Sequence, residues 1–400
     1  MRSNTSQKFT STDKFLWIVT FAFLVSINIF GEKPIILVGF SLLMLLFSNF
    51  KLTINKYHLF TLQFCLYCYA TLFWAMNGYY TIRISKTIFF SLIALYIYYE
   101  YWKNIKDINI LLKIIMWAGF VVVVYTYFYY GVEDIISSEE DGARMQNAFN
   151  NVNTIAMLTA IVLMLNYYFF LFVKKDWTIV IWLPCLFIIG ATQSRKAFVM
   201  LVLGIFFLYY FKQRRNAKGD SLLPSMKIAA FTITGIFTLI ILSQTSMFSG
   251  LADRMNGLIA SITGEGKEDA SSYLRRIYRE AAWRQFHKTP FFGCGINNSL
   301  LFLHEEYGKS TYTHCNYAEL AACGGIVGLI SYYSMYLYLL FKELKYIKLD
   351  SSAVLIVTWL LIRLMTDWGA VTYYTLTNYF YLMLFFIHLD NMKRKYPQVR

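Results

Sequence analysis

The chain has little charge and little proline. Only 15% of its 400 residues are Asp, Glu, Lys or Arg, and it has five prolines. A soluble domain averages about a quarter charged residues. A sequence that is 58% hydrophobic, with a mean hydropathy of +0.46, is therefore that of an integral membrane protein. No small-residue cleavage site follows the first apolar run, so we expect that run to be a retained transmembrane helix and not a signal peptide.

The six cysteines form no metal-binding pattern. Cys65 and Cys68 have CxxC spacing, but they lie inside an apolar run, which favours packing within a helix. The spacing of Cys294, Cys315 and Cys323 fits no zinc motif. Acidic residues also show no cluster at metal-ligand spacing in the segments that we place outside the membrane. The sequence therefore predicts no metal and no cofactor.

Apolar runs of membrane-spanning length make up most of the chain. A helical span needs about 20 largely apolar residues. The runs lie near residues 15–31, 34–50, 57–76, 84–102, 108–130, 152–173, 177–193, 196–211, 226–244, 322–341, 352–366 and 371–389. We therefore predict an all-α polytopic membrane protein with about 12 transmembrane helices (10–12). Residues 1–400 would form one membrane domain, with 245–320 as a large extracytoplasmic loop.

The distribution of positive charge predicts the orientation. The net charge is +14, but most of the excess sits in short segments between spans, which argues against nucleic acid as a partner. If the N-terminus is cytoplasmic, 21 of the 37 lysines and arginines fall in inner segments, and every inner loop has some. Both termini should then be cytoplasmic. The cations left on the outer side need another explanation, and a shared anionic ligand is one.

The large loop carries an arginine-rich helix. Ser271 and Ser272 can cap a helix that runs to about Lys288, before Pro290. Four arginines lie off its apolar stripe: Arg275, Arg276, Arg279 and Arg284. They could form a cationic face that touches anionic lipid headgroups. Four arginines without a lysine among them also suit bidentate phosphate recognition.

Three further features lie on the same predicted side. Residues 290–295 read Pro-Phe-Phe-Gly-Cys-Gly, a tight turn whose glycines allow close backbone approach. His314 stands where this loop meets the next membrane helix, whereas the histidines at 58, 287, 304 and 388 are interpreted as hydrogen-bonding surface residues. Arg195 begins a span, where an unpaired arginine is costly and is by default a functional residue.

Taken together, these segments resemble the O-antigen polymerase and O-antigen ligase superfamily of membrane glycosyltransferases. The resemblance covers roughly residues 140–335 and rests on the order and spacing of several loose motifs. The matching positions are Arg144 with Asn153, Ser194-Arg195-Lys196-Ala197, Arg275 fifteen residues before Pro290, His314, Tyr317, Glu319, Gly325 and Gly328. The residue after the histidine is often Asn or Ser in the family and is Cys315 here, so no role is assigned to that position.

The resemblance implies a GT-C-like fold in the bacterial cytoplasmic (inner) membrane and a metal-independent glycosyl transfer. The donor and acceptor would be undecaprenyl-diphosphate-linked glycans, with membrane lipids and a chain-length regulator protein as further partners. Arg195 and Arg275 would bind the diphosphate, with Arg144 or Arg276 assisting, and His314 would deprotonate or orient the acceptor hydroxyl. The remaining substrate-binding residues would be Asn153, Tyr317 and Glu319.

The form of the His314–Leu320 motif favours a polymerase of O-antigen, capsular or exopolysaccharide repeat units. The alternatives are a ligase that transfers the glycan to lipid A core or another surface acceptor, a polysaccharide flippase or other transporter, and a scaffolding membrane protein. A transporter would carry polar residues along its helices and have short loops. Here the polar residues gather in one outer loop instead.

Overall fold

The protein was analysed as a computed structural model, which describes residues 9–133, 135, 149–173, 178–216, 222–243, 246–263 and 270–399. Fifteen α-helices lie within these ranges. They are α1 (Ser11–Phe30), α2 (Pro34–Phe47), α3 (Lys56–Ala70), α4 (Gly78–Trp102), α5 (Ile108–Tyr130), α7 (Val152–Tyr168), α8 (Trp182–Thr192), α9 (Arg195–Asn216), α10 (Leu223–Ser243), α11 (Ser246–Thr263), α12 (Ala270–Lys288), α13 (Ser299–Tyr307), α14 (Asn316–Leu344), α15 (Ser351–Thr366) and α16 (Leu376–Lys395). Each of the twelve apolar runs contains one of them.

Six of these helices are long and apolar enough to cross a membrane, which makes this a polytopic membrane protein. They are α1, α4, α5, α7 with the short turn that follows it, α9 and α14. The helices α2, α8 and α15 are apolar but shorter. Local sequence sets many of the helix starts: Thr10 forms a capping box with Asp13, and Asn55, Asn77 and Asp107 each accept a hydrogen bond from the first turn.

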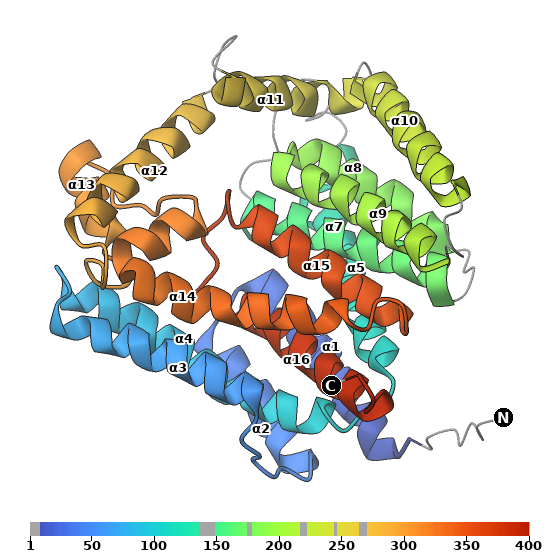
Figure 1. Ribbon diagram of the computed structural model, residues 1–400, viewed down its shortest axis with the longest axis horizontal. Coiled ribbons are helices and arrows are strands. Elements are labelled where there is room, and N and C mark those ends of the chain that lie inside the picture. The colour runs from blue at the N-terminus through green and yellow to red at the C-terminus, as the bar shows by residue number, and fades with distance from the viewer. Residues whose placement is uncertain are drawn as a thin grey trace.

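The helices pack as a bundle, with α12 and α13 at one end (Figure 1). Helix α7 is central and contacts α5, α8 and α9, while α15 packs against α9 and α14, and α12 packs against α14. Segments that the sequence assigns to one side of the membrane meet at the same end. Asn150 donates to the Asn28 carbonyl at one end, and Lys395 pairs with Asp350 at the other.

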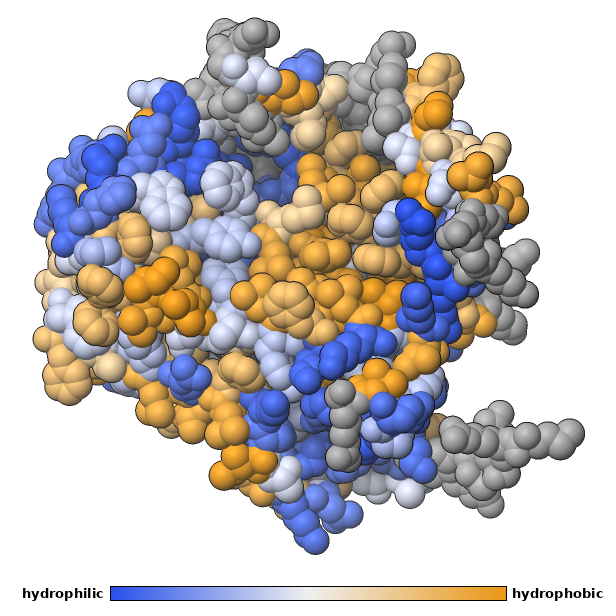
Figure 2. All heavy atoms as spheres, viewed as in Figure 1, coloured by the Kyte–Doolittle hydropathy of each residue, from blue (hydrophilic) through white to orange (hydrophobic). Residues whose placement is uncertain are grey.

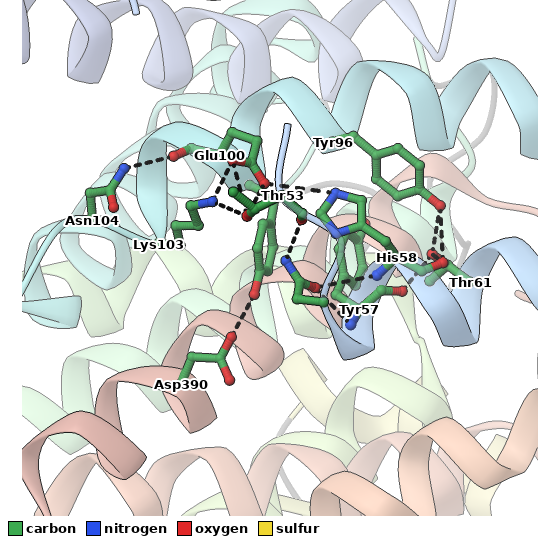
Figure 3. Close-up of polar contacts among 11 residues, drawn as sticks. Thr53, Tyr57, His58, Thr61, Tyr96, Glu100, Lys103, Asn104 and Asp390 are labelled. Atoms are coloured by element: carbon green, nitrogen blue, oxygen red, sulfur yellow. Dashed lines mark hydrogen bonds and ion pairs between the residues drawn. The ribbon is translucent and has the colours of Figure 1, made fainter. Parts of the chain in front are cut away.

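Polar side chains around the start of α3 and the end of α4 form a cluster (Figure 3). Glu100 pairs there with Lys103, and the His58 ring lies 4.0 Å from the same carboxylate. His388 is bonded between Ser352 (2.7 Å) and Glu343 (2.9 Å) and has no exposed surface. Reading His58 and His388 as surface residues was therefore wrong: both are buried, because the helix ends that carry them are packed together. His287 and His304 are exposed, as predicted.

The predicted helix in the large loop is confirmed as α12. It begins at Ala270, so Ser271 and Ser272 lie in its first turn and not at its cap. Ser272 is 4% exposed, and its hydroxyl accepts a hydrogen bond from Arg195. The loop also contains α11 and α13, which the sequence analysis did not anticipate.

Candidate active site

One face of α12 lines a cavity beside α9 and α15. Ser272, Arg275 and Arg279 stand on this face, because positions three and four apart in a helix lie above one another. Arg276 follows Arg275 by about 100° around the helix and does not line the cavity. It pairs instead with Glu280 at 3.2 Å on the exposed side. Of the four arginines on α12, the structure thus directs Arg275 and Arg279 into the cavity.

This cavity, here called the cationic cavity, has a volume of about 420 Å³. Among the residues that the structure describes, its charged lining residues are Arg195, Lys196, Arg275 and Arg279. Its apolar lining residues include Val199, Met200, Leu203, Ile362 and Met365, which come from α9 and α15. Figure 2 shows the same division on the surface, with hydrophilic residues over α12 next to a hydrophobic area over α9 and α15. Such a cavity can bind an anion that is attached to a hydrocarbon chain.

Arg195 fixes the cationic cavity to the loop helices. Its Nη1 donates to the Arg254 carbonyl and to the Ser272 hydroxyl, both at 2.9 Å. In return, Arg254 Nη1 donates to the Gln193 carbonyl at 3.1 Å. Gln193 has a φ of 46°, so the chain reverses sharply between α8 and α9 and places Arg195 at the first position of its helix. Arg195 therefore orders the site as well as lining it.

His314 lies between two aromatic rings in the segment before α14. Its ring centre is 4.3 Å from that of Tyr312 and 6.4 Å from that of Tyr278 on α12. Burial, together with the positive charges of Arg275, Lys196 and Arg279, lowers the pKa of His314 to about 3. The imidazole is therefore neutral at physiological pH, and it lies within the field of the cavity cations.

Two of the predicted substrate-binding residues hold this segment in place. Glu319 is fully buried; its carboxylate accepts from the Thr313 amide at 2.9 Å and from the Ser299 hydroxyl. Tyr317 donates to the Leu364 carbonyl at 2.7 Å. Their polar groups are thus bonded within the protein. His314 has a φ of 58°, which requires local support of this kind.

The glycine turn at 290–295 packs against a break in α14. Gly325 is non-helical (φ 61°, ψ −168°), so the carbonyls of Ala322 and Cys323 accept from the amides of Cys294 and Gly295, both at 3.0 Å. A Cβ on Gly325 would lie 2.3 Å from the Phe291 oxygen. The predicted close backbone approach is thus confirmed, and its partner is the chain's own helix.

A second cavity of about 330 Å³ lies beside the first, and its lining includes Asn153. The two cavities share Lys196, Met200, Ile362 and Thr366. Asn153 also accepts from the Ser194 hydroxyl at 3.1 Å, which places it next to Arg195. Arg144 lies outside the described residues. Within the part of the chain that the structure describes, His, Cys, Asp and Glu form no group that could hold a metal ion, and all six cysteines are buried.

Sequence reasoning did not assign Lys196 and Arg279 to the site. Both line the cationic cavity and lower the pKa of His314. The i, i+4 spacing of Arg275 and Arg279 could have indicated that these two share a face. Arg363, in the wall of the second cavity, was also missed, because only the packing of α15 shows that its side chain is enclosed.

The fold and the cavities define a polytopic membrane protein with a cationic site beside an apolar wall. Residues 179–333 match the family model described as O-antigen ligase. This segment contains Arg195, Arg275 and His314. The match covers less than half of the chain, so it is this segment that is similar to the family domain described as O-antigen ligase. No curated protein sequence matches the chain.

Proposed function

We propose that the protein polymerises oligosaccharide repeat units carried on undecaprenyl diphosphate, such as those of an O-antigen or a capsular polysaccharide. The observation that carries this proposal is the cationic cavity. Four cations stand over an apolar wall, which matches a diphosphate joined to a polyprenyl chain. Arginine suits this ligand because its planar fork can donate two hydrogen bonds to a phosphate group.

The reaction joins two sugars and releases the lipid diphosphate. A hydroxyl of the acceptor glycan attacks the anomeric carbon of the donor, and the bond from that carbon to the diphosphate oxygen breaks. The hydroxyl proton leaves, and the new glycosidic bond inverts the anomeric centre in a single in-line step. Negative charge grows on the departing diphosphate, where Arg195, Arg275, Arg279 and Lys196 stabilise it.

His314 is the candidate base or hydrogen-bond acceptor for the attacking hydroxyl. Its neutral imidazole can accept a proton, and it lies close enough to the cavity cations for them to lower its pKa. A bound diphosphate would compensate those cations and raise the pKa of His314 back toward its ordinary value. The base would thereby become stronger when the donor is in place. Glu319 and Tyr317 would act through His314 by holding its segment.

The activity test compares three histidines. In His314→Ala, cells should accumulate single repeat units on the carrier lipid, since loss of a general base costs about 10²–10⁴-fold in rate. His287→Ala and His304→Ala are matched controls because both side chains are exposed and stand at the same end of the molecule. Surface glycan would be compared on gels at equal membrane expression. Long chains from the His314 variant would remove this residue from catalysis.

A ligase is the second candidate, because the matching family model is described as O-antigen ligase. The two functions leave different lipid-linked intermediates when the enzyme is inactivated. Loss of a polymerase leaves single repeat units on the carrier, whereas loss of a ligase leaves long chains on the carrier that are not joined to a surface acceptor. Extracted lipid-linked glycans from the His314→Ala strain would distinguish them.

The proposed orientation places both termini in the cytoplasm and the loop 245–320 outside, with about twelve spans in a GT-C-like arrangement. The six native cysteines are buried, so single exposed cysteines can report on each side. A membrane-impermeant thiol reagent should label Lys309→Cys in intact spheroplasts and should label Lys348→Cys only after lysis. The opposite result would place the candidate site in the cytoplasm and overturn the proposal.

A further inference from the structure

The second cavity differs from the cationic cavity in its charge balance and in the kind of group that lines it. Its charged lining residues are Lys196, Arg363 and Glu32. Arg363 faces a countercharge, because its Nη2 lies 3.5 Å from Asp367 Oδ1. Among the described residues, and counting Asp367, two basic and two acidic side chains line or flank this cavity. This cavity therefore does not suit a second diphosphate.

Amide and aromatic side chains make up most of its polar lining. The amides are Asn28, Asn150, Asn151, Asn153 and Asn378, and the aromatic residues are Tyr312, Trp359, Tyr374 and Tyr381. An amide presents both a donor and an acceptor, which matches neighbouring hydroxyl groups of a sugar. An aromatic ring offers an apolar face on which the C–H side of a sugar can pack. The volume of about 330 Å³ is in the range of small-molecule sites.

Arg363 lines this cavity, and part of its guanidinium makes no hydrogen bond to a described protein atom. Its Nε and Nη2 are buried and have no hydrogen-bond partner in the part of the chain that the structure describes. The Asp367 carboxylate, in contrast, already accepts from Asn316, Tyr333 and Thr372 at 3.0–3.1 Å. A buried donor without a partner is costly, so a ligand oxygen at this position would be favoured.

The position of the second cavity also fits the reaction. Lys196, Met200, Ile362 and Thr366 separate it from the cationic cavity. Tyr312 belongs to its lining and lies 4.3 Å, ring centre to ring centre, from His314. His314 thus stands beside both cavities. A hydroxyl held in the second cavity would approach an anomeric carbon next to Lys196, with His314 nearby.

We propose that the second cavity binds the acceptor saccharide as a neutral, hydroxyl-rich sugar, with Arg363 donating to its oxygens. This assignment rests on the proposed function. It divides the two substrates by chemistry: the cationic cavity recognises the lipid diphosphate of the donor, and the second cavity recognises the free end of the acceptor glycan. Recognition at the acceptor site then depends on the sugar and not on the carrier lipid.

Two probes test the division on the full-length protein in lipid nanodiscs. One is undecaprenyl diphosphate, and the other is the delipidated repeat-unit oligosaccharide released from the surface polysaccharide of the host strain. Thermal stabilisation by each is compared for the wild type, Arg363→Gln and Arg279→Gln. We expect Arg363→Gln to weaken oligosaccharide binding roughly tenfold or more and to leave undecaprenyl diphosphate binding unchanged. Arg279→Gln should do the reverse.

Arg363→Gln could disturb the bonds around Asp367, so a second variant leaves that network intact. Met157 lines only the second cavity, and Met157→Trp would fill it. This variant should also lose oligosaccharide binding while it retains binding of undecaprenyl diphosphate. If oligosaccharide binding survives in both variants, the acceptor assignment is wrong. If undecaprenyl diphosphate does not stabilise even the wild type, the donor site and the proposed function fail instead.

Discussion

The two adjacent arginines of α12 offer a controlled test of the cationic cavity. Arg275 lines the cavity, whereas Arg276 is 40% exposed and pairs with Glu280, which is itself 49% exposed. The two residues have the same charge, the same helix and neighbouring positions. Replacement of each by Gln therefore makes the same change in net charge and differs only in the direction in which the lost group points.

The two substitutions should differ in how much they slow glycosyl transfer. A hydrogen bond from a charged donor contributes about 1.5–3 kcal/mol. If Arg275 donates to the departing diphosphate, Arg275→Gln should slow transfer roughly 10- to 150-fold. Arg276→Gln breaks an exposed i, i+4 ion pair, worth about 0.3–0.5 kcal/mol of stability, and should leave transfer within about twofold of the wild type.

The assay measures glycan chain length in cells and the thermal stabilisation of purified protein by undecaprenyl diphosphate. Arg275→Gln should shorten the chains and lose the stabilisation, and Arg276→Gln should do neither. Equal losses in both variants would show that α12 acts through its general positive charge, as a helix lying against anionic lipid would. A loss confined to Arg276→Gln would refute the cavity as the donor site.

Three further outcomes follow from the geometry. Gly325→Ala should lower the unfolding temperature of the protein. The φ and ψ of Gly325 belong to a region that costs other residues about 1–3 kcal/mol, and a Cβ there would meet the Phe291 oxygen. Gly39→Ala is the control and should leave the unfolding temperature unchanged, because Gly39 has open space around it. Arg195→Lys should abolish most activity at normal expression, since a lysine has no planar guanidinium to hold a donor where Nη1 joins Arg254 and Ser272. Wild-type chain length in this variant would show that charge alone suffices. For His314 as base, activity is lost as pH falls through its pKa. Because that pKa is lowered to about 3 in the free enzyme, kcat/KM should stay flat from about pH 5 to 8. The acid limb of kcat should lie at a higher pH than the acid limb of kcat/KM. An acid limb of kcat/KM near the ordinary histidine pKa would contradict this assignment.

The fold was predictable because its main determinant is local. A run of about 20 apolar residues without charges has few alternatives to a helix in a membrane, and all twelve predicted runs contain one. The helix in the large loop was predictable for a similar reason, since Pro290 limits where α12 can end. The break in α14 was not foreseen. Gly325 leaves the helical conformation because residues 290–295, some thirty positions earlier, bond to the exposed backbone.

The site was only partly predictable, because its residues come from helices that are distant in sequence. The resemblance identified Arg195, Arg275 and His314; the two arginines line one cavity, and His314 lies near enough for the charge of Arg275 to lower its pKa. The resemblance could not separate residues that face the cavity from residues that support the backbone around it, since both kinds belong to the same motif. Glu319 stands five positions after His314, yet its carboxylate is fully occupied by Thr313 and Ser299.

Arg363 is a residue that the motifs could not identify. It belongs to none of the motifs, lies in a helix that is otherwise apolar, and follows the region covered by the family model. An arginine in such a place is costly unless it is paired or binds a ligand. Asp367 lies within ion-pair distance of Arg363, and Arg363 lines a cavity that also touches Tyr312, the ring beside His314. In this protein the motif residues thus gather around the charged leaving group. The residues that would select the acceptor lie on α1, α7, α15 and α16, mostly outside the region that the family model covers.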